Sequence, residues 1–278
     1  MARMLFCQLG PVAYQISACK CRMVRQVQDL FGSDKFAKVR STQPLPFLVC
    51  KHASLIRRTL GNVELELQEN KATNLGLAAP KVNGILIRPG ESFSFWHLVG
   101  SCTRRKGYRD GLTIAGGKPQ KGMGGGMCQF TNLIHWMVLH SELTITEHHH
   151  HDQYDLFPDC GRQIPFGTGT SILYNYMDYR VRNDTDAVWQ LLVHTDDTHL
   201  YGQLRCDKEP RVKYHVHIEN EYFSKEGEDV FRNGTVVREC IDKATGNLLS
   251  SAVIKRNHAK VLYDTSHLEL KEDTAEFV

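Results

Sequence analysis

The stretch GMGGGMCQFTNLIHWMVLH, from Gly122 to His140, indicates how the fold of this 278-residue chain is organised. Four of its first five residues are glycine, a cysteine follows, and the rest has the spacing of a helix. Apolar residues recur there at i, i+3, i+4, i+7 and i+8, a pattern that predicts one face packed on a core. They are Phe130, Leu133, Ile134, Met137 and Val138. We therefore expect a central helix that begins at the glycine loop.

The cysteine of this stretch, Cys128, lies off the apolar face, on a more polar face with Thr131, Asn132 and His135. The glycines place it near the helix N-terminus, where free N–H groups and the helix dipole lower a thiol pKa. The same N–H groups can hold an oxyanion, and glycines let a substrate approach closely. We therefore predict a nucleophile that alkylates faster below pH 7 than the other eight cysteines. The alternative is a helix start that needs only a tight turn.

Four consecutive histidines in TEHHHHD (Thr146–Asp152) offer a base for this thiol. They continue a predicted strand, Glu142–Glu147, and strand alternation places Glu147, His149 and His151 on the face that carries Ile145. If that face packs on the helix, His149 and His151 point towards Cys128. We favour His151 as the base and His149 as a substrate contact, and we expect His148 and His150 to face solvent.

Two alternatives to a Cys–His pair stay open. One is a solvated polar strand end, and the other is a zinc site formed by alternate histidines and Cys128. Because no second thiol or carboxylate has a recognisable spacing, we predict neither a metal ion nor any other cofactor.

Charge, cysteine usage and hydropathy exclude several classes of protein. The net charge of +3 and the lack of a basic block argue against nucleic acid as a partner. Nine scattered cysteines favour free thiols in a reducing compartment. No apolar run has the length of a membrane span, and the N-terminus lacks the unbroken apolar region of a secretory signal. We therefore expect a cytoplasmic protein whose oligomeric state stays open.

Along the chain, helical periodicity gives way to strand signals, which predicts an α+β fold. The expected fold has N-terminal helices followed by an antiparallel sheet packed on the one central helix. The predicted helices lie after Pro11 as far as Gly32, at Phe47–Leu60, and around Thr73–Lys81. The predicted strands lie within Gly84–Trp96 around Pro89-Gly90, within Leu112–Gly122 over Gly116-Gly117, at Glu142–Glu147, and beyond Pro165, with hairpin turns at Asn233-Gly234 and Thr245-Gly246-Asn247.

Several motifs together resemble the VanW family, which is named for an accessory member of vancomycin-resistance clusters. They are ENKATNLGLAAPKVNGILIRPGESFSFWHLVG (Glu69–Gly100), GYRDGLTIAGGK (Gly107–Lys118), GMGGGMCQFTNLIH (Gly122–His135), ELTITEHHHHD (Glu142–Asp152) and YNYMDYRVRNDTD (Tyr174–Asp186). The resemblance implies a family core at residues 69–206, preceded by a helical region at 1–68. We expect residues 207–278 to form a β-rich extension packed on this core.

For function, the resemblance implies acyl transfer of the L,D-transpeptidase type on peptidoglycan stem peptides. The family cysteine falls on Cys128, and its E-x-H-x-H pattern falls on Glu147, His149 and His151. Candidate substrate or oxyanion contacts are Gly124, Gly125, Gly126, Gln129 and Tyr174. The second hypothesis is a non-catalytic accessory protein that binds cell-wall precursor peptides or another resistance protein.

Overall fold

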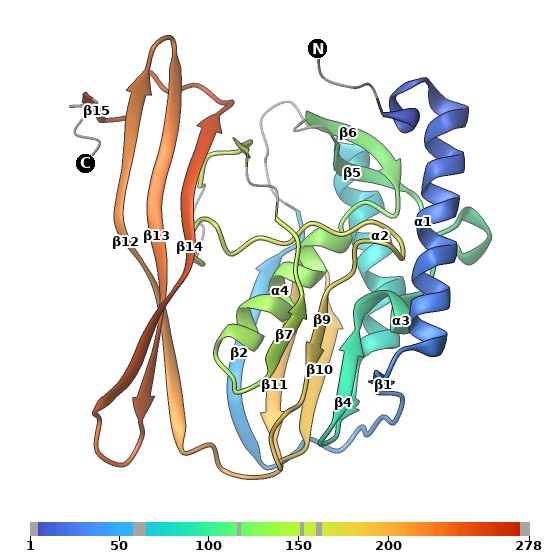
Figure 1. The fold of residues 1–278 in the computed structure, drawn as a ribbon, viewed down its shortest axis with the longest axis vertical. Helices are drawn as coiled ribbons and strands as arrows, with labels where there is room; N and C mark the ends of the chain where they lie inside the picture. The colour runs from blue at the N-terminus through green and yellow to red at the C-terminus, as the bar shows by residue number, and fades with distance from the viewer. Residues whose placement is uncertain (1–4, 58–64, 116–117, 151–152, 160–162, 273–278) are drawn as a thin grey trace.

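A computed structural model describes residues 5–57, 65–115, 118–150, 153–159 and 163–272 of the chain. As predicted, the fold is α+β, with a helix at the N-terminus (Figure 1). The helices of the described residues are α1 (Pro11–Phe31), α2 (Leu65–Val82), α3 (Phe95–Val99) and α4 (Met127–Leu139), with short 3-10 turns η1 (Phe6–Gln8) and η2 (Arg104–Lys106). The helix predicted after Pro11 is confirmed, and the one predicted around Thr73–Lys81 begins earlier, at Leu65.

The predicted central helix is α4, and it packs on an antiparallel sheet of order β2-β11-β10-β3. These strands are β2 (Phe47–Leu55), β11 (His199–Cys206), β10 (Trp189–Thr195) and β3 (Ile85–Ile87). All five residues of the predicted apolar stripe are buried in the main core. The helix approaches the sheet closely at Gly202, where a Cβ would lie 2.6 Å from side-chain atoms of both Leu133 and Met137. Hydrophobic burial along this stripe therefore fixes the orientation of α4.

A second sheet has the order β1-β4-β9-β7, and a separate hairpin of β5 and β6 precedes the glycine loop. The strands of the second sheet are β1 (Lys35–Phe36), β4 (Glu91–Ser94), β9 (Arg180–Arg182) and β7 (Thr144–Glu147). The predicted hairpin is formed by β5 (Asp110–Ala115) and β6 (Lys118–Met123), and its Gly116-Gly117 tip lies outside the described residues. Strands β3 and β4 flank the predicted Pro89-Gly90 turn.

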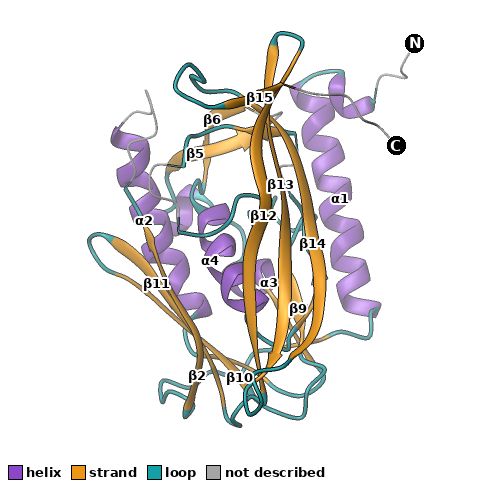
Figure 2. Cartoon of the chain, turned by 90° about the vertical axis from the view of Figure 1, so that its left-hand side faces the viewer, coloured by secondary structure: helices purple, strands orange, loops and turns teal. Residues whose placement is uncertain are grey.

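The C-terminal part forms a long, twisted sheet beside this body (Figures 1 and 2). Its order is β15-β12-β13-β14-β8, from β15 (Leu270–Glu272), β12 (Val212–Glu226), β13 (Asp229–Asp242), β14 (Leu248–Val261) and β8 (Tyr154–Asp155). A small apolar cluster of Leu139, Val216 and Val236 joins it to the end of α4. Arg238 Nε also donates to the Leu139 carbonyl, at 2.7 Å, and thereby satisfies a carbonyl at the helix C-terminus.

Two sequence predictions about elements are wrong. The segment predicted as a helix at Phe47–Leu60 begins as β2, which pairs with β11 from Phe47 to Leu55; its apolar residues meet a neighbouring strand that local periodicity does not reveal. Asn233-Gly234 does not form a turn, because it lies inside β13 between β12 and β14. The turn predicted at Thr245–Asn247 is confirmed, with Gly246 at a φ of 74°.

The division into residues 1–68, 69–206 and 207–278 stays a prediction. The pairing of β2 with β11 nevertheless ties the first of these parts into the sheet of the second.

Candidate functional site

The glycine loop ends at α4 as predicted, and Cys128 is the second residue of that helix. Gly124 and Gly126 have positive φ values of 74° and 107°, and Gly126 is the N-cap. A residue with a Cβ adopts this left-handed region only at a cost, so both positions favour glycine. The loop therefore directs the chain from β6 into α4 within a few residues.

Close packing within the protein is sufficient to explain why glycine occupies positions 124, 125 and 126. A Cβ on Gly124 would lie 2.6 Å from the Cβ of Cys102, and one on Gly126 would lie 2.6 Å from Cγ of Lys71. A Cβ on Gly125 would lie 2.3 Å from the backbone of Gly111. Packing against α2, β5 and Cys102 therefore requires glycine at all three positions, whether or not a ligand approaches the loop.

Asn74 of α2 anchors the same loop. Its amide donates to the carbonyl oxygens of Arg109, at 3.0 Å, and Gly125, at 2.9 Å. Its side-chain oxygen accepts from the Arg109 N–H at 2.8 Å. The Asn74 side chain is buried, so these bonds hold the loop against β5 in a region that water does not reach.

The thiol of Cys128 is not activated as the sequence analysis predicted. Burial raises the pKa of Cys128, and hydrogen bonds from the backbone at Ile172 and at Cys128 itself oppose this rise only in part. The helix N-terminus was expected to lower the pKa, but desolvation disfavours the thiolate more strongly here. The prediction of a lowered pKa is therefore wrong for the protein without a ligand.

The desolvation comes partly from a segment that the sequence analysis did not assign to the site, residues 168–174. Thr170 anchors it to α4: its backbone N–H donates to Asn132 Oδ1 at 2.7 Å, and its hydroxyl donates to the same oxygen at 2.8 Å. Its hydroxyl also contacts that of Thr131. We call residues 168–174 the strap. On the polar face of α4, Thr131 and His135 are thus buried, whereas Cys128 and Asn132 are half-buried. The helical spacing of these four residues was the sequence signal for polar partners.

The histidine run contradicts the predicted alternation. The ring of His148 packs on the ring of the buried His135 of α4, with centroids 4.0 Å apart. The ring centroid of His150 lies 3.9 Å from that of His148. His149 instead turns to Glu147, with Nε2 at 2.9 Å from Oε1. His148 and His150 are therefore half-buried and not fully solvent-facing as expected, and His151 lies outside the described residues.

A β-bulge causes this inversion. Strand β7 pairs Ile145 with Val181 and Glu147 with Arg180, so Thr146 is an extra residue. A bulge shifts all later side chains to the opposite face of the sheet. Glu147 consequently leaves the face of Ile145, and the histidines after it exchange sides.

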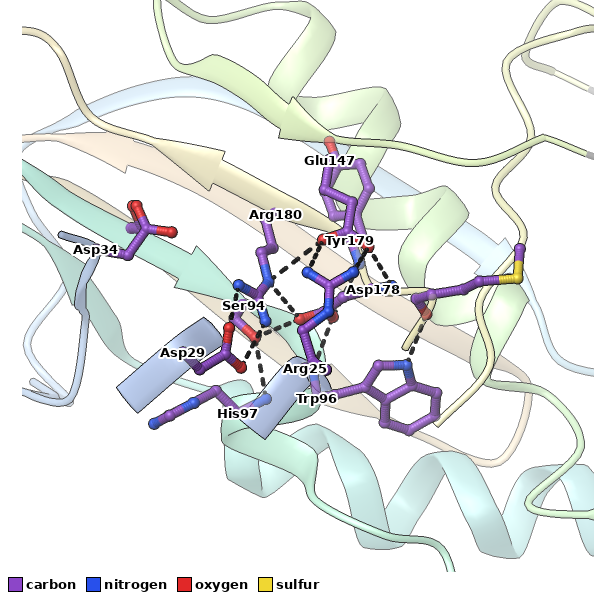
Figure 3. A network of polar contacts seen from close by, with 12 residues as sticks. Arg25, Asp29, Asp34, Ser94, Trp96, His97, Glu147, Asp178, Tyr179 and Arg180 are labelled. Atoms are coloured by element: carbon purple, nitrogen blue, oxygen red, sulfur yellow. Dashed lines mark hydrogen bonds and ion pairs between the residues drawn. The ribbon is translucent and has the colours of Figure 1, made fainter. Parts of the chain in front are cut away.

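Glu147 belongs to an ionic network that fixes α1 on the second sheet (Figure 3). Its carboxylate binds Arg25 of α1 through two bonds of 2.6 and 2.8 Å and accepts the Asp178 N–H at 2.8 Å. Burial alone would raise the pKa of Glu147, but Arg25, the Asp178 amide and His149 keep it below its usual value. The family's glutamate therefore has a structural role here, and it also orients His149.

Of the eight predicted site residues, His149 is not among those that line the cleft, and His151 lies outside the described residues. The other six line one cleft, of about 1540 Å³. Its lining includes Gly124, Gly125, Gly126, Cys128, Gln129 and Tyr174. Gln129 Nε2 donates to Ser54 Oγ and to the Leu55 carbonyl, both at 2.8 Å, and so joins α4 to β2. Tyr174 packs edge-to-face on Trp96, at 5.5 Å between ring centroids. The cleft also receives Arg22 from α1 and Ile172 from the strap.

Sequence comparison with known proteins identifies the family of this chain. Residues 70–205 match the family described as VanW like protein. Over 228 residues the chain is 34% identical to vancomycin B-type resistance protein VanW of Enterococcus faecalis, covering 82% of each chain. It is 28% identical over 115 residues to the uncharacterized protein YoaR of Bacillus subtilis, covering 41% of this chain and 36% of that protein.

This chain belongs to the VanW family. The resemblance recognised in the sequence is thereby confirmed. No solved structure matches the chain. Within the described residues, no helix has both the length and the apolar character that crossing a bilayer requires.

Proposed function

We propose that this chain is a vancomycin-resistance-associated protein that binds a peptidoglycan stem peptide, or another cell-wall precursor peptide, in the cleft beside Cys128. One observation carries the proposal: Cys128, the three glycines, Gln129 and Tyr174 line the same cleft. The name of the similar Enterococcus faecalis protein supports the link to vancomycin resistance.

The lining of the cleft suits a peptide. Its volume of about 1540 Å³ exceeds the range of roughly 300–1,000 Å³ that is usual for a small-molecule pocket. Aromatic side chains of Tyr14, Trp96 and Tyr174 offer apolar contact, and Arg22 supplies positive charge. Arg57 also lines the cleft, but its charge is already paired with Glu69. Positive charge attracts a carboxylate, which a stem peptide carries at its C-terminus.

A calorimetric titration with a synthetic stem pentapeptide tests binding. We expect saturable binding that is weakened at least tenfold in Tyr174→Ala, because an aromatic wall of the cleft is lost. Tyr222→Ala is the matched control, since Tyr222 is an exposed tyrosine on β12 and should leave the affinity unchanged. Absence of binding to the wild-type protein, or equal loss in both variants, contradicts the proposal.

A second candidate function is acyl transfer by Cys128. It is favoured by the position of Cys128 at the helix N-terminus in the cleft wall, with hydrogen bonding from the Ile172 backbone. The thiolate would attack a peptide carbonyl carbon, forming a C–S bond. The C–N bond would then break as the leaving amine takes a proton. The amine of a second stem peptide would then attack this thioester, so that a new C–N bond forms, the C–S bond breaks and the amine gives up a proton to a base. The thiolate is thereby returned.

Because burial raises the thiol pKa in the free protein, this chemistry requires ligand binding to promote loss of the proton. His149 and His151 are the bases that the family pattern supplies, although His149 already bonds to Glu147. Intact mass spectrometry after incubation with the stem peptide separates the two functions. An acyl adduct that Cys128→Ala abolishes supports transfer. Tight binding without an adduct supports the non-catalytic accessory protein.

The proposal includes a cytoplasmic location with reduced thiols. Cell fractionation and thiol counting test it, and recovery of the protein outside the membrane would contradict it.

A further inference from the structure

The exposed face of the C-terminal sheet carries a cluster of metal-ligating side chains, away from the cleft. His215 and His217 alternate on β12 and therefore share a face. Glu239 of β13 lies directly opposite His215 in the strand register. One ligand atom from each residue can be chosen so that all three lie within 4.8 Å of one another.

The two ring nitrogens of His217 have the hydrogen bonding that is usual for a histidine that binds a metal ion. Its Nε2 lies 3.1 Å from Glu219 Oε1. Its Nδ1 is buried and has no hydrogen-bond partner within the described structure. When Nε2–H donates to a carboxylate, the proton is fixed on that nitrogen and Nδ1 keeps its lone pair. Metal-bound histidines usually have this arrangement, with the second nitrogen held by a carboxylate.

His215 and Glu239 supply the other two ligands of this set. His215 Nδ1 lies 3.4 Å from Glu239 Oε2, a separation close to the roughly 3.4 Å between neighbouring ligands of a tetrahedral ion with bonds of about 2.1 Å. The two rings are stacked with their centroids 4.8 Å apart. The backbone register of the two strands thus places all three residues together.

We propose that His215, His217 and Glu239 bind one divalent transition-metal ion, with Glu219 orienting His217. Two imidazoles and one carboxylate suit Zn²⁺ and its first-row neighbours and leave a coordination position open to water or to an outside ligand. The ion joins β12 to β13. The site is independent of the function proposed for the cleft.

Equilibrium dialysis against Zn²⁺ with elemental analysis tests the site in the full chain. Because cysteines also bind zinc, the decisive quantity is the difference between proteins with the same cysteines. We expect His215→Ala/His217→Ala to bind one equivalent less than wild type. Glu219→Gln should weaken the same site about 10–100-fold, the usual effect of removing such an orienting partner. His267→Ala is the control, since His267 is an exposed histidine outside the cluster, and it should keep the wild-type stoichiometry.

Co²⁺ gives a second readout that identifies the ligand type. The difference spectrum between wild type and the double variant should show d–d bands without thiolate-to-cobalt charge transfer. Glu239→Gln keeps both histidines and the shape of the carboxylate, so it tests the site if the double variant fails to fold. Equal Zn²⁺ stoichiometry in wild type and folded variants overturns the proposal, as does a difference spectrum dominated by thiolate bands.

Discussion

At the residue scale, the chemistry of Cys128 depends on competition between the helix N-terminus and burial. The N-terminus favours the thiolate, but the strap and the core remove water from the sulfur, and the pKa is raised. A thiol in this state is a poor nucleophile until a ligand or a base changes its surroundings.

This balance predicts the order of alkylation in the free protein. At pH 7, iodoacetamide should modify the exposed Cys19 and Cys21 before Cys128, because only the thiolate reacts. Peptide mapping by mass spectrometry over time gives the order, with Cys128→Ser to assign the peptide. If Cys128 reacts first below pH 7, its thiolate is favoured after all, and the acyl-transfer candidate gains support over simple binding.

A comparison of two glycines separates the free-energy cost of overpacking a side chain from the cost of backbone strain. Gly124 and Gly246 both have a φ of 74°, but a Cβ would meet Cys102 at 2.6 Å in the first case and nothing within 4 Å in the second. Gly246→Ala should therefore cost about 1 kcal/mol from strain alone. Gly124→Ala should cost about 2 kcal/mol more, because it also overpacks the site. Urea unfolding measures both, and equal costs would show that the loop tolerates a side chain.

At the element scale, α1 is held largely by buried ion pairs, because Ala18 is its one buried residue and most of its large apolar side chains are exposed. Arg180 of β9 binds both carboxylate oxygens of Asp29, at 2.7 and 2.9 Å, and also Asp178 at 2.9 Å (Figure 3). Burial opposes the charge of Arg180, but the two carboxylates outweigh it and keep the pKa above its usual value. Removing one carboxylate would leave a buried guanidinium partly unpaired.

Asp29→Asn should therefore destabilise the docking of α1 by about 3 kcal/mol. Hydrogen exchange of the α1 amides measures this locally. Asp184→Asn is the matched control, because Arg182 and Asp184 form an exposed pair on and beside the same strand. Its loss should be undetectable. Unchanged exchange in Asp29→Asn would mean that the Asp29–Arg180 pair does not hold α1 in place.

At the scale of the whole molecule, buried histidines make stability depend on pH. Burial, and then the neighbouring His148 and His150, hold the pKa of His135 well below its usual value. His135 is therefore neutral in the folded protein near pH 6, whereas in the unfolded chain it takes up a proton. Its contribution to stability is complete above about pH 6.5 and is lost as the pH falls below that value.

The free energy of unfolding should accordingly fall between pH 7 and pH 5, by up to about 1.4 kcal/mol per pH unit for this one group. His135→Gln should reduce the slope, because glutamine does not titrate and can still hydrogen-bond to Tyr179. The slope should not vanish, since His140 also has a lowered pKa. Chemical denaturation at several pH values measures it, with His267→Gln as an exposed control. A slope unchanged in His135→Gln would contradict the assignment.

Local pattern was sufficient for several features of this protein. The apolar stripe determined α4 and its buried face, and the glycines determined that Cys128 begins a helix. The motifs determined the family. Gly124, Gly125, Gly126 and Gln129 line one cleft because they cluster around a single helix start, whereas Tyr174 reaches this cleft from the strap.

Only the tertiary structure decided the rest. Phe47–Leu55 is a strand because β11 lies beside it, and no local periodicity records a partner about 150 residues away. The bulge at Thr146 exchanges the faces of the histidines, since one extra residue inverts every later side chain. The thiol pKa of Cys128 rises because the strap, some 40 residues further along the chain, excludes water. Register and desolvation both depend on remote segments, and a sequence read in short windows does not contain them.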